Sequence, residues 1–231
     1  MKNLICLLAL AVLSVLLTGC GTDAPPETTT AVEMPQPSEN PEDFSLEQLE
    51  AFTGGNVSIR YSPDTGMPKE ITGKFSSHGI FSAEDAVAAL GSVKTLFGIE
   101  ELNFVCTQVD ERTDATVYWL DQLWQGIPVS GYGFRVEAGA DGAAQFVSGS
   151  YLQGISVDVS GALAAESCTA ALELYPGEQI AASRQVILEE KDQVVLCWEF
   201  HIVGADPLME RLVFCDAFTG EPVKTRMMAM S

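Results

Sequence analysis

Cysteine and histidine are the residues of this chain that could supply a catalytic nucleophile and its base. A cysteine becomes nucleophilic when a cationic neighbour or a helix N-terminus lowers its thiol pKa. Cys197 and Cys215 instead stand close in sequence to Glu199 and Asp216, and carboxylates raise a thiol pKa. Cys168 falls on the apolar side of an expected helix, as a small core residue does. The sequence therefore predicts a protein that is not an enzyme.

Metal binding is the second chemistry to consider. The chain has no H-E-x-x-H motif, and its histidines, His78 and His201, are too far apart in sequence to suggest a zinc helix. Residues 110–114 read DERTD, which lacks the alternating ligands and the central glycine of a calcium loop. A loop position for His78 and a strand position for His201 are the simpler interpretations. We therefore expect no metal ion and no cofactor.

A disulfide is the remaining role for the cysteines. If Val203 and Leu208 flank a hairpin turn, Cys197 lies opposite Phe214, one residue from Cys215. A register one residue different, or a bulge, would place Cys197 and Cys215 face to face. The bridge and four reduced thiols both remain open at this point.

The segment between Val117 and Gly149 predicts an antiparallel meander of three strands. The first strand, Val117–Trp124, has large apolar residues at consecutive positions, so we expect it to be covered on both sides. Gln125-Gly126 and Ala140-Asp141-Gly142 are turn signals on either side of the second strand. In that strand apolar and polar residues alternate, which is typical of a half-buried strand.

The aromatic residues of the first strand allow two interpretations. Core packing is the ordinary role of Tyr118, Trp119 and Trp124. The alternative is an exposed face that binds glycan or peptide.

The first twenty residues predict an export signal. Lys2 is the positive n-region, and the apolar run Leu4–Leu16 follows it. Leu17-Thr18-Gly19-Cys20 comes next and resembles the bacterial lipobox. The resemblance implies that diacylglycerol is attached to the Cys20 sulfur, so that acyl chains hold the protein on the extracytoplasmic side of the cell membrane. An ordinary signal peptide with an incidental cysteine is the alternative.

Acidic composition marks the next segment and the chain as a whole. Residues 21–43 are rich in Pro, Thr and Glu and contain no Lys or Arg, which predicts a disordered tether. At about 3.1 Å per residue, an extended tether would reach roughly 70 Å from the anchor. The net charge of −20 over 231 residues argues against nucleic acid and anionic lipid as partners, because both would be repelled.

The sequence after residue 43 predicts an α+β protein of two small units, residues 44–156 and 157–231. Each is expected to be an antiparallel sheet packed against a helix. In the first unit a helix begins after Ser82 and is expected to end at Gly98. The other expected elements are helices at Phe44–Phe52 and Ala162–Leu174, and strands at Val57–Tyr61, Ile71–Phe75, Leu102–Asp110, Gln185–Glu189, Val194–Val203 and Leu208–Ala217.

Two motifs in this order resemble known families. A strand, then G-I-P-V-x-G at residues 126–131, a strand, an A-D-G turn and a further strand resemble the central segment of the fungalysin/thermolysin propeptide (FTP) domain. The later helix and three strands, followed by D-A-F-T-G-E at residues 216–221, resemble a PepSY domain. Together the resemblance covers about residues 44–226. It implies a propeptide-like module, which in its relatives assists the folding of a metallopeptidase and blocks its cleft.

The resemblance implies a protein that binds a secreted peptidase in trans, and inhibits it or assists its folding. In the resembled propeptides the last segment leads toward the peptidase cleft. Met227, Met228 and Met230 are therefore candidate partner-binding residues on an extended tail, and a frayed terminus is the alternative. A surface module that binds cell-wall glycan or peptide, and a structural envelope lipoprotein, are the alternative functions.

We expect Cys20→Ser to abolish acylation and cleavage by the lipoprotein signal peptidase, because only the cysteine sulfur forms the thioether to diacylglycerol. Labelling of cells with an alkyne fatty acid measures this directly. Equal label on the wild type and the variant would refute the predicted lipid anchor.

Overall fold

The computed structural model describes residues 43–204 and 210–228. Cys20, residues 21–42 and Met230 lie outside these ranges. The chain divides into residues 1–37 and 38–231, and every element described here belongs to the second part. No helix within the described ranges is long and apolar enough to cross a membrane.

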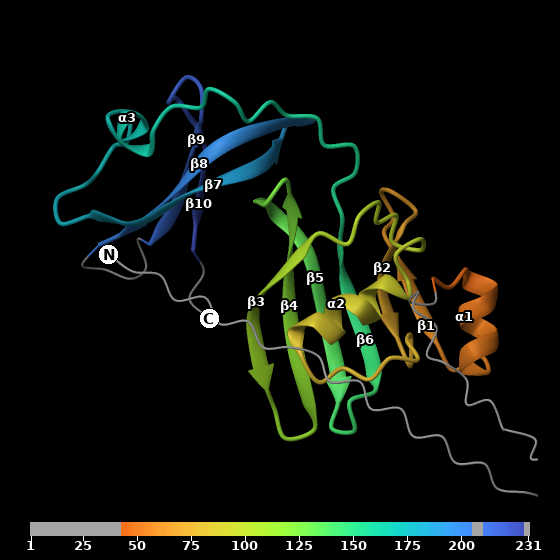
Figure 1. Ribbon diagram of the computed structural model, residues 1–231. Helices are drawn as coiled ribbons and strands as arrows, with labels where there is room; N and C mark the ends of the chain where they lie inside the picture. Colours follow the sequence, from red (N-terminus) through yellow and green to blue (C-terminus); the bar gives the residue numbers. More distant parts are fainter. Residues whose placement is uncertain (1–42, 205–209, 229–231) are drawn as a thin grey trace, which may run out of the picture. The chain divides into compact units, whose positions relative to one another are not determined.

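Six strands form an antiparallel sheet in the order β1-β2-β6-β5-β4-β3 (Figure 1). The predicted turn at Gln125-Gly126 is confirmed, with φ of 50° and 81°, which is the left-handed backbone that joins two strands in a tight hairpin. The second strand begins and ends three residues earlier than Ile71–Phe75, the predicted range. The strands are β1 (Ser58–Tyr61), β2 (Pro68–Thr72), β3 (Phe104–Glu111), β4 (Ala115–Trp124), β5 (Ile127–Gly139) and β6 (Ala144–Ser150).

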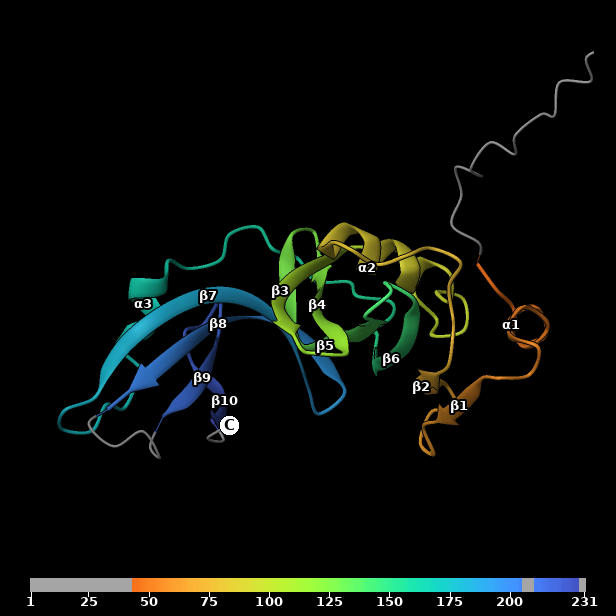
Figure 2. The same cartoon turned by 90° about the horizontal axis from the view of Figure 1, so that it is seen from below.

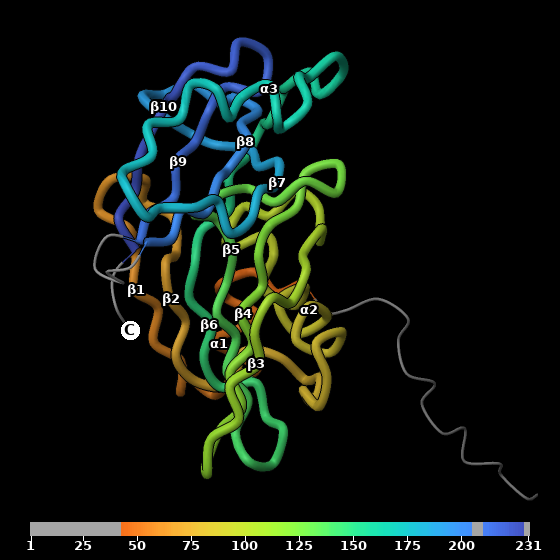
Figure 3. Tube along the Cα trace, turned by 90° about the vertical axis from the view of Figure 1, so that its left-hand side faces the viewer, coloured from red at the N-terminus to blue at the C-terminus, as the bar shows by residue number. Residues whose placement is uncertain are grey.

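Helix α2 (Ala83–Gly91) covers one face of this sheet (Figures 1 and 3). Ser82 caps it as predicted, because the Asp85 N–H donates to the Ser82 hydroxyl at 3.1 Å. The helix ends at Gly91 rather than at Gly98, and turns carry the chain onward. Helix α1 (Leu46–Thr53) contributes Leu49 to the same apolar core.

The expectation that the first meander strand is covered on both sides is wrong. Tyr118 and Leu120 of β4 are buried in the core beneath α2. Trp119 points the other way, because side chains alternate along a strand, and it is 41 % exposed. The sheet therefore has a covered face and an open face, and Trp119 lies on the open one.

Four further strands, β7 (Gln179–Glu190), β8 (Gln193–Val203), β9 (Arg211–Asp216) and β10 (Pro222–Met227), form an antiparallel ladder in chain order. Helix α3 contributes Cys168 to the core on one face of this ladder (Figure 2). It spans only Ala165–Thr169, so the predicted helix Ala162–Leu174 is wrong in length, and its N-cap residue, Ala164, has no side chain that could accept a capping hydrogen bond. Residues 224–227, the first part of the expected free tail, instead belong to the edge strand β10.

Strand β5 connects the two ladders. It pairs antiparallel with β4 and β6 and parallel with β7, where Val129 lies opposite Ile187 (Figures 1 and 2). The α+β class is confirmed as a sheet-rich fold with few helices. The division into two units near residue 156 stays a prediction.

A close approach between β4 and β5 requires glycine at position 133. A Cβ atom there would lie 2.2 Å from the Leu120 carbonyl oxygen, and φ is 155°. We expect Gly133→Ala to lower the free energy of unfolding by about 3 kcal/mol. Urea unfolding followed by circular dichroism measures this.

Gly131→Ala is the matched control. Its φ of 86° imposes the same class of backbone strain, but no atom lies within 4 Å of the added Cβ. We expect it to cost about 1 kcal/mol. Equal losses for the two variants would contradict the close approach as the cause.

Candidate functional site

A hollow of about 500 Å³ lies on the open face of β4 and β5, and residues of β7, β8, β9 and β10 also line it. Gly131 and Gly133 line this hollow, and because they carry no side chains, they leave its space open. The charged side chains that line it are Asp121, Arg135, Arg184, Glu199 and Arg226, and its aromatic lining residues are Trp119, Tyr132 and Phe134.

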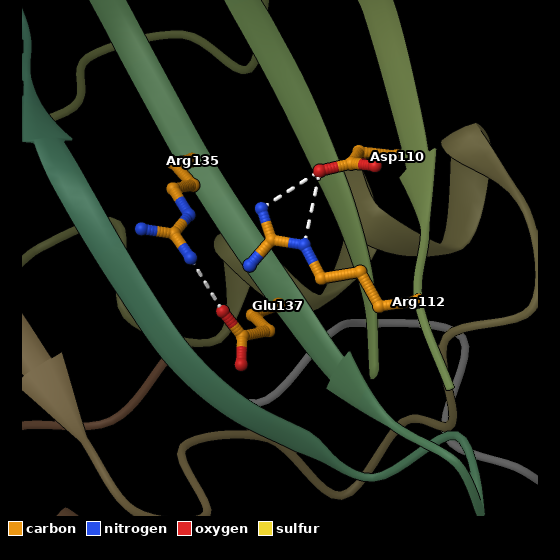
Figure 4. A network of polar contacts seen from close by, with 4 residues as sticks. All are labelled: Asp110, Arg112, Arg135 and Glu137. Carbon is orange, nitrogen blue, oxygen red and sulfur yellow. Dashed lines mark hydrogen bonds and ion pairs between the residues drawn. The ribbon is translucent and has the colours of Figure 1, made fainter. Parts of the chain in front are cut away.

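Arg135 forms one wall of this hollow. It lies opposite Trp119 in the β4–β5 register, and its guanidinium is 5.8 Å from the Trp119 ring centroid and 5.1 Å from that of Phe146. Nη2 donates to Glu137 at 2.7 Å (Figure 4). The Nε atom of Arg135 is buried and has no hydrogen-bond partner among the described residues. The two rings and the carboxylate thus fix the guanidinium in place.

A second ion pair lies on the same open face, outside the hollow. Arg112 donates from Nε and Nη2 to one oxygen of Asp110, at 3.0 and 2.7 Å (Figure 4). This hydrogen bond raises the pKa of Arg112. The pair falls within the DERTD segment considered above for calcium. Within the described part of the chain, no group of three or more His, Cys, Asp or Glu side chains is placed to hold a metal ion.

Arg184 and Glu199 form the opposite wall, on β7 and β8. Arg184 Nε donates to Glu199 at 2.6 Å, and this is the only hydrogen bond of its guanidinium to the described residues. The Arg184 side chain is 53 % exposed, whereas that of Glu199 is 8 % exposed. The two terminal nitrogens of Arg184 thus keep their N–H donors for another group.

Asp121 lies on β4 two residues beyond Trp119, on the same face. Burial raises its pKa, and the positive charge of Arg184 partly opposes that effect. Arg226 reaches the hollow from the edge strand β10, with its guanidinium 5.4 Å from the centroid of the Phe214 ring. The site therefore combines three cations with two carboxylates.

The predicted methionine site is not one surface. Met227 is the last residue of β10 and Met228 follows it directly, and the two side chains line different hollows. Met227 lines a separate hollow of about 480 Å³ with Tyr175 and Leu172, and Met228 lines a third hollow beside His201.

The structure also separates the two cysteines proposed to form a bridge. Cys197 lies opposite Asp216 and Trp198 lies opposite Cys215, so the two thiols face opposite sides of the sheet. Cys215 shares its apolar cluster with Cys168. Both Cys197 and Cys215 are free.

Burial makes these thiols poor nucleophiles. It raises the pKa of the Cys197 thiol to about 12 and that of the Cys215 thiol to about 11. Because the thiolate is the reactive form, neither cysteine is suited to catalysis at neutral pH.

Sequence reasoning missed the arginines. Arg135 was visible as a polar residue in the alternating pattern of β5, but nothing in its neighbourhood along the chain connected it to Arg184 or Arg226. The one signal that could have pointed to these arginines is the scarcity of arginine, since only six occur in a chain of net charge −20.

We expect iodoacetamide to label Cys106 first in the native protein, because it is partly exposed while the other three cysteines of the folded part are buried. In urea without reductant all four should become labelled. Mass spectrometry of the tryptic peptides measures this. If Cys197 and Cys215 stayed unlabelled in urea until reductant was added, the free thiols described here would be wrong.

Comparison with known proteins gives a family match and similarity to solved structures. The sequence profile of the Fungalysin/Thermolysin Propeptide Motif matches residues 100–151. No curated protein matches the chain. Among solved structures, the Bacillus megaterium YpeB C-terminal domain is 15 % identical, with a TM-score of 0.44, and the alignment covers 82 % of this chain and 100 % of that one. The segment that carries β3 to β6, and with them Trp119 and Arg135, is thus similar to the Fungalysin/Thermolysin Propeptide Motif.

Proposed function

We propose that this protein is an extracytoplasmic, propeptide-like binding module that acts on a secreted peptidase in trans. The observation that carries the proposal is the propeptide-motif match to residues 100–151. Those residues build the open sheet face and one wall of the hollow. The matched segment therefore forms a large part of the candidate binding surface.

The composition of the open face supports a protein partner. One cross-strand row contains Arg60, Glu70, Ser148, Arg135 and Trp119, so it presents an aromatic ring among charged and polar groups. Tryptophan and arginine are the residues that most often dominate binding energy at protein interfaces. Trp119 is 41 % exposed and stacked by Arg135, so a partner would meet it already ordered.

A lipid anchor completes the proposal. The lipobox-like sequence at Cys20 and the acidic segment after it would hold the module outside the cell membrane, where secreted peptidases pass. Inhibition and assistance in folding both fit a module of this kind, and the two differ in whether the bound peptidase is mature.

A second candidate function is a surface module that binds cell-wall glycan or peptide, and the exposed ring of Trp119 favours it. The other two aromatic residues of β4, Tyr118 and Trp124, do not extend this exposed surface. Tyr118 is 5 % exposed beneath α2, and Trp124 packs beside Val129 where β5 meets β7. The three aromatics therefore form no common platform, and Trp119 alone would have to serve.

We expect the purified protein to inhibit a secreted thermolysin-like metallopeptidase, and Trp119→Ala to weaken that inhibition at least tenfold. Because Trp119 is half-exposed, its loss should change the free energy of unfolding by less than about 1 kcal/mol. The assay is hydrolysis of a quenched fluorescent peptide against inhibitor concentration. Phe218→Ala is the control, since that ring is also 41 % exposed but lies outside the open face.

Two outcomes would count against the proposal. If neither inhibition nor improved refolding of the peptidase is found, the peptidase partner should be abandoned. Retention of the wild type on purified cell wall, lost in Trp119→Ala, would then favour the second candidate.

A further inference from the structure

We infer that the hollow between β4, β5 and β7–β10 is a subsite for an acidic peptide segment, whose carboxylates are bound by Arg226 and Arg184 beside the Trp119 ring. The inference deepens the proposed function and rests on it in one respect, that the peptide belongs to a protein partner. The binding chemistry itself is independent of which protein that is.

The distribution of charge is the first argument. The chain has 12 basic and 32 acidic residues, so cations are scarce. Three of its six arginines line this one hollow. Each of the other three is paired with a carboxylate elsewhere: Arg60 with Glu70, Arg112 with Asp110, and Arg211 with Glu178.

Unused hydrogen-bond donors are the second argument. Arg184 uses only Nε in its pair with Glu199. Arg226 forms no ion pair with the described residues and is held against Phe214 instead. A guanidinium presents a planar fork of donors that matches a carboxylate in a bidentate geometry. Two such forks face the hollow, one from β7 and one from β10, the first and last strands of the second ladder.

The backbone of β5 argues for a peptide. Asp121 pairs with Gly133 and Leu123 pairs with Pro128, so residues 129–132 have no partner on β4. Ser130 and Gly131 in this stretch line the hollow. Main-chain groups released from a ladder at the edge of a groove can bind an extended peptide.

The carboxylates of the hollow argue against a phosphate polymer. Asp121 and Glu199 line it together with the arginines. A phosphate polymer carries a negative charge on every repeating unit of its backbone, whereas a peptide can place a neutral main-chain segment beside these two carboxylates. The apolar side of the hollow, at Trp119 and Leu212, also suits the methylenes of a glutamate side chain.

A fluorescein-labelled hexaglutamate peptide tests this by fluorescence anisotropy on the mature protein, with hexaglutamine as the neutral probe. We expect hexaglutamate to bind, hexaglutamine not to bind, and Arg226→Gln to weaken the binding at least tenfold. Trp119→Ala should also weaken it, and binding should fall as NaCl is raised, because salt screens exposed charges.

Arg112→Gln is the matched control, since it removes the same charge from the open face of the six-stranded sheet, outside the hollow. We expect it to change the affinity less than twofold. Circular dichroism of each variant establishes that the fold is kept, so that a lost signal reports the hollow.

Three results would overturn the inference: no binding of hexaglutamate, equal effects of Arg226→Gln and Arg112→Gln, or tight binding of inorganic polyphosphate with none of hexaglutamate. The last would assign the hollow to a phosphate polymer. Suppose that hexaglutamate binds in a way that depends on Arg226, but the protein has no effect on any peptidase. The subsite would then be supported and the proposed function refuted.

Discussion

The structure depends on four residues of β5, Val129 to Tyr132, that leave their antiparallel neighbour β4. Their only pairing with another strand is the contact of Val129 with Ile187 of β7, which is parallel. Without this departure the six-stranded sheet and the second ladder would share no hydrogen bonds between strands. The hollow with its three arginines exists because one strand serves both ladders.

Two side chains hold that departure in place. Gln122, opposite the unpaired stretch, is 1 % exposed, and its amide both donates to the Leu152 carbonyl and accepts from the Leu152 N–H, each at 2.9 Å. The Tyr132 hydroxyl donates to Glu189 of β7, and burial together with this hydrogen bond raises the pKa of Tyr132 to about 12. A buried amide thus ties β4 to Leu152 and a neutral phenol ties β5 to β7, and neither bonds to the main chain of the unpaired stretch.

Local sequence signals predicted most of the helices, strands and turns. They did not predict the pairing register or the contacts between residues that are distant in sequence. Ser82 and the turn at Gln125-Gly126 were recognisable because capping and positive φ are local properties. The register of β8 against β9 differs from the predicted one by two residues, so Cys197 lies opposite Asp216 instead of Phe214. A shift of two residues keeps each side chain on its face, and Cys215 stays on the other side. The gathering of distant arginines has no local signal at all.

The placement of the tryptophans gives the protein a built-in optical reporter. Trp124 and Trp198 both pack into the small apolar cluster around Val129, Ile187 and Leu196, where β5 meets β7. Only Trp119 lies on the open sheet face. Intrinsic fluorescence therefore reports mainly on the connection between the ladders. A red shift of the emission with unchanged far-ultraviolet circular dichroism would show this connection opening while the strands on either side persist.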